Sequence, residues 1–228
     1  VNEAIASVRE LQERPTGNLR MNAPMSFGTQ HLAPVVAEFM AEHPDLHVEL
    51  VLNDRFVDPI EEGFDMTLRI AEPEYPTSLI SRQIVPARRV LCASPAYLDS
   101  AGEPASPAEL KDRRCLQYGY SGTLHYWRLA GPDGEQTWPI NCVMYSNNGE
   151  VLKAAATRHQ GIALLPTFIV GEELQSGTLQ TVLADYRPSE LIVSALYPRH
   201  RHLSAKVRLF VELLEERFGS RPYWDLVS

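Results

Sequence analysis

Residues 17–52 read GNLRMNAPMSFGTQHLAPVVAEFMAEHPDLHVELVL, in which a strand pattern is followed by a helix pattern and a second strand pattern. Leu19, Met21 and Ala23 alternate with polar residues up to Pro24, as in a half-buried strand. After a turn at Met25–Thr29, apolar residues recur at helical spacing, at Leu32, Val35, Val36, Phe39 and Met40. Leu46 to Leu52 alternate again as a strand. Strands that alternate with helices indicate an α/β fold with a mostly parallel sheet.

The pattern continues on the C-terminal side of this stretch. A short helix is predicted from Val57 to Glu62, ended by Gly63, and a third strand from Met66 to Ile70. Residues 79–93 are predicted as extended segments broken at Pro86. A final strand at Leu191–Leu196 precedes a last helix that carries Val207, Phe210, Val211, Leu214 and Phe218.

The middle of the chain has a different texture. Ser94-Pro95 and Ser106-Pro107 are each typical of a helix N-cap followed by proline, and Ser106 with Glu109 predicts a capping box. Residues 127–145 predict a hairpin around the turn at 131–134. The remaining predicted elements are a helix capped at Ser146–Asn148, a strand at Ile162–Leu165 halted by Pro166, a helix through Phe168–Leu174 and a strand at Thr178–Val182.

The N-terminal stretch predicts a helix without a start signal. Its apolar stripe consists of Val1, Ala4, Ile5, Val8 and Leu11, and no capping residue precedes Val1. Residues 1–16 are therefore expected to be the end of a longer helix, which makes the sequence look like a fragment.

Composition excludes several classes of protein. The 228 residues carry 21 basic and 29 acidic side chains, a net charge of −8, with 44% hydrophobic and 22% charged residues, so a globular fold is expected rather than disorder. The acidic balance disfavours nucleic-acid binding by this polypeptide itself. No apolar run is long enough for a membrane span, and no signal peptide is present at residues 1–20. Three scattered cysteines favour a cytoplasmic location and no disulfide or zinc scaffold.

The sequence contains no recognisable catalytic motif, since phosphate-binding, dinucleotide-binding, metalloprotease and serine-hydrolase signatures are all missing. His200 and His202 lack a neighbouring Cys, Asp or Glu and fit a solvated loop better than a metal site. The paired glutamates at 61–62 and 215–216 fit solvated helix surface. Neither an enzyme nor a metal or cofactor site is expected.

One type of feature indicates ligand binding. Met25–Thr29 lies between the end of a strand and the start of a helix, where backbone N–H groups and the hydroxyls of Ser26 and Thr29 converge. Ser146–Asn148 repeats this arrangement in the second half of the chain. Each is explained singly by ordinary helix capping. Two such ends, together with Arg69 at a strand end, favour an anion-binding site.

Several stretches in a fixed order complete the pattern: Gly17–Arg20, Pro24–Gly28, Leu32–Pro34, His43-Pro44, Glu62–Asp65, Leu68–Ile70, Ala93–Leu98, Gly161–Pro166 and Ser176–Leu179. Over nearly its whole length the chain resembles the effector-binding region of LysR-type transcriptional regulators. Ser94-Pro95-Ala96-Tyr97-Leu98 and the strand Leu68–Ile70 are similar to the branch that includes the CrgA-like regulators.

The resemblance implies two Rossmann-like subdomains of the periplasmic-binding-protein type II kind, joined by two crossover segments. Subdomain 1 is expected at 17–91 and 193–228, subdomain 2 at 92–192, and the end of the linker helix at 1–16. The DNA-reading winged helix-turn-helix is expected upstream. In the cleft between the subdomains, the resemblance implies effector-binding residues at Ser26, Phe27, Gly28, Thr29, Asn53 (or Asp54), Arg69, Tyr118 or Tyr120, Asn147, Asn148 and Thr167. Arg69 fits equally well a brace of the subdomain interface.

The function expected from this resemblance is the effector-sensing and oligomerisation module of a cytoplasmic bacterial transcription factor. The expected partners are a small organic acid that carries a carboxylate, a second copy or more of the chain in a homodimer or homotetramer, and operator DNA through the missing N-terminal domain only. No membrane partner is expected. The alternative is a solute-binding protein of a transporter, which shares the two-lobed fold.

Overall fold

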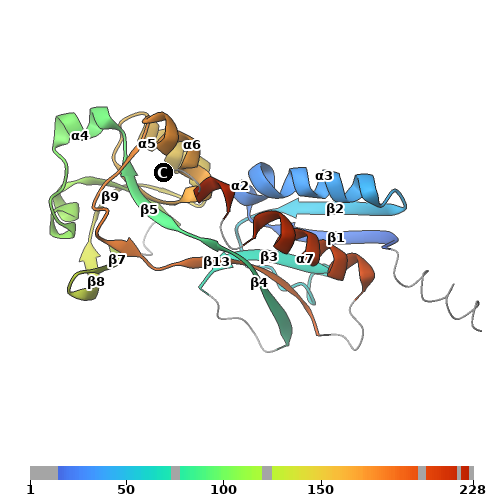
Figure 1. The fold of residues 1–228 in the computed structure, drawn as a ribbon. Helices are drawn as coiled ribbons and strands as arrows, with labels where there is room; N and C mark the ends of the chain where they lie inside the picture. The colour runs from blue at the N-terminus through green and yellow to red at the C-terminus, as the bar shows by residue number, and fades with distance from the viewer. Residues whose placement is uncertain (1–14, 73–77, 120–124, 200–203, 220–221, 226–228) are drawn as a thin grey trace, which may run out of the picture. The chain divides into compact units, whose positions relative to one another are not determined.

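The computed structural model describes residues 15–72, 78–119, 125–199, 204–219 and 222–225. The predicted linker helix at 1–16 therefore falls almost wholly outside the described residues. The chain forms two compact units (Figure 1). Unit 1 consists of the described residues of 1–86 and 192–222, and unit 2 of those of 87–191 and 223–228.

Unit 1 is built on a five-stranded sheet in the order β2-β1-β3-β13-β4. The strands are β1 (Gly17–Ala23), β2 (Leu46–Leu52), β3 (Met66–Ala71), β13 (Leu191–Pro198) and β4 (Leu79–Ala87). β1 pairs in parallel with β2 and β3, whereas β13 pairs antiparallel with β3. The three parallel strands are the ones that the alternation of apolar residues predicts.

Two helical segments supply the core of unit 1. The first begins at Met25 and comprises α2 (Met25–Phe27), a π-helical turn (Gly28–Leu32) and α3 (Ala33–Glu42). The second is α7 (Ala205–Phe218), and α3 and α7 pack through Phe39 and Phe210, whose ring centroids lie 5.0 Å apart. The predicted turn at 25–29 is thus wrong, because the helix starts directly after Pro24 and the turn residues are its first residues.

The predicted helix at Val57–Glu62 is also wrong, since residues 59–63 form hydrogen-bonded turns. Gly63 does adopt the predicted left-handed conformation, with φ of +68°. Arg20 fixes this segment to the sheet, because its Nη1 donates to the Glu62 carbonyl oxygen (2.7 Å) and its guanidinium lies 4.4 Å from the centre of the Phe64 ring. Pro86 lies within β4 instead of interrupting it, and the break comes at Arg88.

Unit 2 contains a five-stranded sheet in the order β11-β5-β10-β6-β9 and a three-stranded sheet in the order β12-β7-β8. The strands of the larger sheet are β5 (Arg89–Ala93), β6 (Arg114–Tyr118), β9 (Asn141–Ser146), β10 (Ile162–Pro166) and β11 (Gln180–Thr181). Those of the smaller sheet are β7 (Tyr126–Gly131), β8 (Gly134–Pro139) and β12 (Arg187–Pro188). The predicted hairpin forms between β7 and β8, but β9 leaves it and pairs in parallel with β6.

The helices of unit 2 pack around a core that contains Leu91, Leu110, Trp127, Leu129 and Ile162. They are α4 (Pro95–Ala101), α5 (Gly149–Thr157), α6 (Thr167–Ser176) and 3-10 turns at Pro107–Asp112 and Tyr223–Asp225. Ser94 caps α4 as predicted, accepting from the Tyr97 N–H. The predicted capping box of Ser106 and Glu109 does not form, because Glu109 Oε1 accepts from the Ala105 N–H.

Candidate functional site

The carboxyl edge of the unit 1 sheet gathers several of the predicted site residues. β1 runs into the helix at Met25, and the Asn53 N–H after β2 donates to the Ala23 carbonyl oxygen (3.0 Å). Met21 pairs with Met66 and Asn22 with Thr67, so the same register places Arg69 level with Pro24. Ser26, Asn53 and Arg69 therefore come from three neighbouring strand ends, where open α/β sheets bind ligands.

A carboxylate of the protein occupies the start of the helix. The Met25 N–H donates to Asp54 Oδ1 (2.9 Å). Burial raises the pKa of the Asp54 carboxyl group, and the bond from Met25 and the positive charge of Arg69 oppose that rise only in part. The first amide of this helix is thus already bound to an acceptor, which an incoming anion has to replace or avoid.

The four consecutive residues after Met25 have different environments. Phe27 is fully buried, and its ring centroid lies 5.5 Å from those of His31 and Phe218, so Phe27 is a core residue. A Cβ added to Gly28 would lie 2.2 Å from Leu52 Cδ2, so this glycine permits close packing of helix and strand. Thr29 is exposed, and its hydroxyl donates to the Met25 carbonyl oxygen (2.9 Å). Ser26 is the buried hydroxyl of this group.

Arg69 is a buried cation with only 7% of its surface exposed. Its Nη2 donates to Asn22 Oδ1 (2.6 Å), and its Nη1 donates to the Leu68 carbonyl oxygen (3.0 Å). The guanidinium carbon also lies 5.9 Å from the centre of the Phe56 ring. Asn22 in turn donates to the Val51 carbonyl oxygen, so it connects Arg69 to β2. The guanidinium is therefore fixed in place by its own unit.

Three other polar side chains in this part of unit 1 are relevant to ligand binding. The Thr67, Ser194 and Asn53 side chains each have a buried oxygen without a hydrogen-bond partner among the described residues. Thr67 is paired with Asn22 across β1 and β3, and Ser194 is paired with Arg69 across β3 and β13. Buried polar atoms usually have partners, so this edge of unit 1 has unused capacity to bind water or a polar ligand.

In unit 2, the remaining predicted residues lie along one edge of the larger sheet. Tyr118 ends β6 and pairs with Ser146, which ends the parallel strand β9. Asn148 caps α5, because its Oδ1 accepts from the Glu150 N–H (2.9 Å) and the Val151 N–H (3.3 Å). Thr167 begins α6 after the parallel strand β10 and is buried. The edge is the carboxyl edge of these strands, as in unit 1.

The side chains at this second edge differ in solvent exposure and in their hydrogen bonds. Tyr118 is 44% exposed, and Asn147 is exposed as well. The Thr167 hydroxyl donates to the Arg88 carbonyl oxygen (3.1 Å), so it is used within the fold. Tyr120, the alternative to Tyr118, lies outside the described residues. The predicted site omits Asn22 and Ser194. Both are buried polar residues within strands. A polar residue inside a predicted buried strand is a signal that the sequence contains.

Other reactive groups lie away from these edges. Burial raises the pKa of the Cys92 thiol and of the Cys115 thiol to about 12, so neither is a nucleophile at neutral pH. Within the described ranges there is no cluster of three or more His, Cys, Asp or Glu that could hold a metal ion. Nor does any described helix have the length and apolarity needed to cross a membrane.

Comparison with known proteins identifies the family to which the chain belongs. The family model of the LysR substrate binding domain matches residues 12–219. An uncharacterized HTH-type transcriptional regulator of Haemophilus influenzae is 36% identical over 207 residues, which cover 91% of this chain and 72% of that protein. The HTH-type transcriptional activator TtdR of Escherichia coli K12 is 32% identical over 220 residues, covering 94% and 70%.

Solved structures agree in fold. The structure of CrgA, a LysR-type transcriptional regulator from Neisseria meningitidis, has a TM-score of 0.81 at 27% identity and covers 96% of this chain and 75% of that one. The CrgA regulatory domain alone has a TM-score of 0.79 at 27% identity, covering 90% and 100%. The two-subdomain fold class predicted from the sequence and the predicted resemblance to CrgA are thereby confirmed.

Proposed function

Because the chain belongs to the LysR substrate-binding domain family, we propose that it is the effector-sensing and oligomerisation module of a bacterial, cytoplasmic transcription regulator. The relatives reported above are transcriptional regulators, which favours this function over a transporter receptor and over an enzyme. Operator DNA is bound by a part of the regulator outside these 228 residues. Units 1 and 2 correspond in this proposal to the two subdomains.

The effector is a small organic acid, and the buried guanidinium of Arg69 is the observation that carries this assignment. Arg69 lies at the same sheet edge as Ser26 and Asn53, where three strands end. Hydrogen bonds to Asn22 and Leu68 hold the guanidinium ready, so little side-chain entropy is lost when an acid binds. Residues Tyr118, Asn147, Asn148 and Thr167 are proposed effector-binding residues of unit 2. That residues of both units bind one effector stays a prediction.

Calorimetry with benzoate tests whether the chain binds a small organic acid. Benzamide, which has the same ring but no charge, is the control. Benzoate should bind more tightly than benzamide, and Ser26→Ala should weaken benzoate binding about three- to tenfold, as expected for one hydrogen bond. Ser81→Ala, at an exposed serine of β4, should leave the affinity unchanged. Equal affinities for benzoate and benzamide would contradict an anion site, and equal effects of the two serine variants would contradict the role of Ser26.

The pH dependence of this binding follows from Asp54. Its raised pKa means that the carboxylate near Arg69 becomes neutral at a higher pH than an ordinary aspartate. Benzoate should therefore bind more tightly as the pH falls from neutral towards that pKa while the benzoate itself stays ionised, since repulsion between the two carboxylates decreases. Asp54→Asn retains an oxygen that accepts from Met25 and should give the tighter affinity already at neutral pH. An unchanged affinity in this variant would contradict an effector carboxylate near Asp54.

The chain is proposed to form a homodimer or homotetramer in which α3 of one copy packs on α5 of another. Met40 of α3 is 42% exposed and Val151 of α5 is 44% exposed, which leaves apolar surface on both helices. Light scattering should give at least a dimer mass at tens of micromolar protein. Met40→Glu should lower this mass, whereas Val143→Glu, at an equally exposed apolar residue of β9, should not. A monomeric wild-type chain would overturn the proposal.

A further inference from the structure

Unit 2 contains a cavity of about 850 Å³. Residues from β5, α6, the segment 179–190 and Trp224 line it, and all of them belong to unit 2. Thr167 is the one proposed effector residue among them. The volume falls within the range of pockets that bind small organic ligands.

The sequence of α6 shapes one wall of this cavity. Thr167, Gly171 and Leu174 follow one another at i, i+4 and i+7, so they share a helix face. A Cβ on Gly171 would lie 3.2 Å from the Trp224 carbonyl oxygen, so glycine allows the C-terminal turn to approach the helix closely. Gly177, in the left-handed region at φ +73°, ends α6 and lets the chain return along the cavity towards Leu179.

The charged lining residues are three arginines and one glutamate, in a chain whose net charge is −8. Arg89 Nε and Nη2 donate to the Ser189 carbonyl oxygen, at 3.1 and 2.7 Å. Arg88 has a side chain that is 59% exposed and only a long contact, 3.4 Å, with Asp225. Arg187 is exposed and has no ion-pair partner in the part of the chain that the structure describes. The charged residues that line the cavity therefore carry a net positive charge, whereas the chain as a whole is negative.

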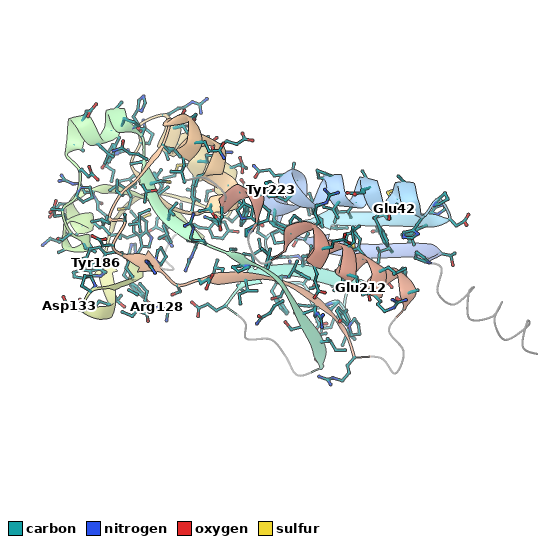
Figure 2. The ribbon with its side chains drawn as sticks, viewed as in Figure 1. Glu42, Arg128, Asp133, Tyr186, Glu212 and Tyr223 are labelled. Carbon is teal, nitrogen blue, oxygen red and sulfur yellow. The ribbon has the colours of Figure 1, made fainter. Side chains whose placement is uncertain are left out.

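Apolar side chains complete the lining. Leu174, Leu179, Val182 and Leu183 line the cavity together with Trp224. Tyr186, labelled in Figure 2, lies on the segment that leads into β12, and its ring packs against Gly131, where a Cβ would come within 2.5 Å. Aliphatic and aromatic walls beside the exposed guanidinium of Arg187 suit a ligand with an apolar body and an anionic end.

We propose that this cavity is a second ligand site, which binds an amphiphilic anion with its carboxylate or sulfonate at Arg187 and its apolar body against α6. None of its lining residues belongs to unit 1, and the proposal does not depend on the proposed effector. Its occupant stiffens α6 against the segment 179–190, because it contacts both.

The test uses two dyes that differ only in charge. 8-Anilinonaphthalene-1-sulfonate carries a sulfonate, and N-phenyl-1-naphthylamine is the same ring system without it. The sulfonate dye should bind the folded chain more tightly than the neutral dye. Arg187→Gln should weaken the sulfonate dye about three- to tenfold and leave the neutral dye unchanged. Arg128→Gln, at an exposed arginine of β7 (labelled in Figure 2) that does not line the cavity, should change neither.

A second experiment tests where the dye binds, independently of its charge. The chain has three tryptophans, so three indole N–H signals are expected in an NMR spectrum of ¹⁵N-labelled protein. The sulfonate dye should shift the Trp224 signal, assigned with Trp224→Phe, and leave that of buried Trp127 in place. Leu174→Trp, which fills the cavity without changing its charge, should abolish dye binding while circular dichroism shows an intact fold.

Each other outcome overturns the proposal. Equal binding of the two dyes, or equal loss in Arg187→Gln and Arg128→Gln, would remove the anion site. A shift of Trp127 or Trp138 without Trp224 would place the dye elsewhere, and undiminished binding to folded Leu174→Trp would show that the cavity is not occupied. The absence of any binding by the sulfonate dye to the folded chain would also refute it.

Discussion

Replacing Arg69 with alanine tests the central side chain of the unit 1 site in the absence of any ligand. The change leaves Asn22 Oδ1 buried without its donor, which costs about 1–3 kcal/mol. Loss of the contact with the Phe56 ring adds about 0.5–1 kcal/mol. The free energy of unfolding should therefore fall by about 1.5–4 kcal/mol. For a cooperative protein of this size, that lowers Tm by roughly 5–15 °C.

The assay is chemical unfolding followed by circular dichroism, performed as a double-mutant cycle with Asn22→Ala. The two side chains share one hydrogen bond of 2.6 Å, so the coupling free energy should be about 1 kcal/mol or more. Arg82→Ala is the matched control, because this arginine lies on the same sheet but its ion pair with Glu215 is at the surface, with the Arg82 side chain 59% exposed. The control should cost no more than about 1 kcal/mol.

Two results would refute this reasoning. An Arg69→Ala chain as stable as wild type would show that the guanidinium is not held by its unit. A coupling free energy near zero would show that the bond to Asn22 contributes nothing. If the ligand-free chain is destabilised and the affinity for benzoate is also unchanged, Arg69 is a structural brace and its proposed contact with the effector is wrong.

Two further perturbations have outcomes set by packing and burial. Gly28→Ala should destabilise the chain by about 1–3 kcal/mol in urea unfolding, because its Cβ meets Leu52, and the additional Leu52→Ala change should recover part of that loss; additive effects would show that the two sites are independent. Burial raises the pKa of Cys92 and Cys115 to about 12, so thiol labelling of the native chain near pH 8 should modify Cys142 alone, with all three labelled after unfolding; prompt native labelling of Cys92 would contradict the structure.

The sequence predicted the parallel core of the fold because that core has strong periodicity. Apolar residues alternate in β1 and β2 and recur at helical spacing in α3 and α7, and the structure has strands and helices at these positions. Elements decided by tertiary contacts were not predictable. Local propensity predicts a helix at 57–62, but the hydrogen bond from Arg20 to the Glu62 carbonyl oxygen holds this segment in a turn. The strand β9 is not part of the hairpin of β7 and β8, because it pairs in parallel with β6 in the larger sheet.

The sequence predicts where the candidate residues lie in the fold better than it predicts their hydrogen-bond partners. Strand-to-helix junctions identify the sheet edge of unit 1 where Ser26 lies and that of unit 2 where Asn148 lies, since turn and cap residues mark both junctions. The partner of each polar atom depends on register across strands. The bond from Met25 to Asp54 joins residues 29 positions apart, and that from Arg69 to Asn22 joins residues 47 apart, so neither leaves a local signal.

The bond between Arg69 and Asn22 bears on both proposed roles of Arg69, as a structural brace and as a contact of the effector. A guanidinium has five N–H donors, and the bonds to Asn22 and Leu68 use one donor each on Nη2 and Nη1. A carboxylate can accept from the same guanidinium that these bonds hold in place, so structural support and effector binding are compatible in one side chain. The two roles predict different signatures: Arg69→Lys keeps the charge but not the fork, so it should retain part of the benzoate affinity while losing the stability gained from Asn22. If instead stability is kept and benzoate binding is lost, the bond to Asn22 is dispensable and ligand binding alone explains the arginine.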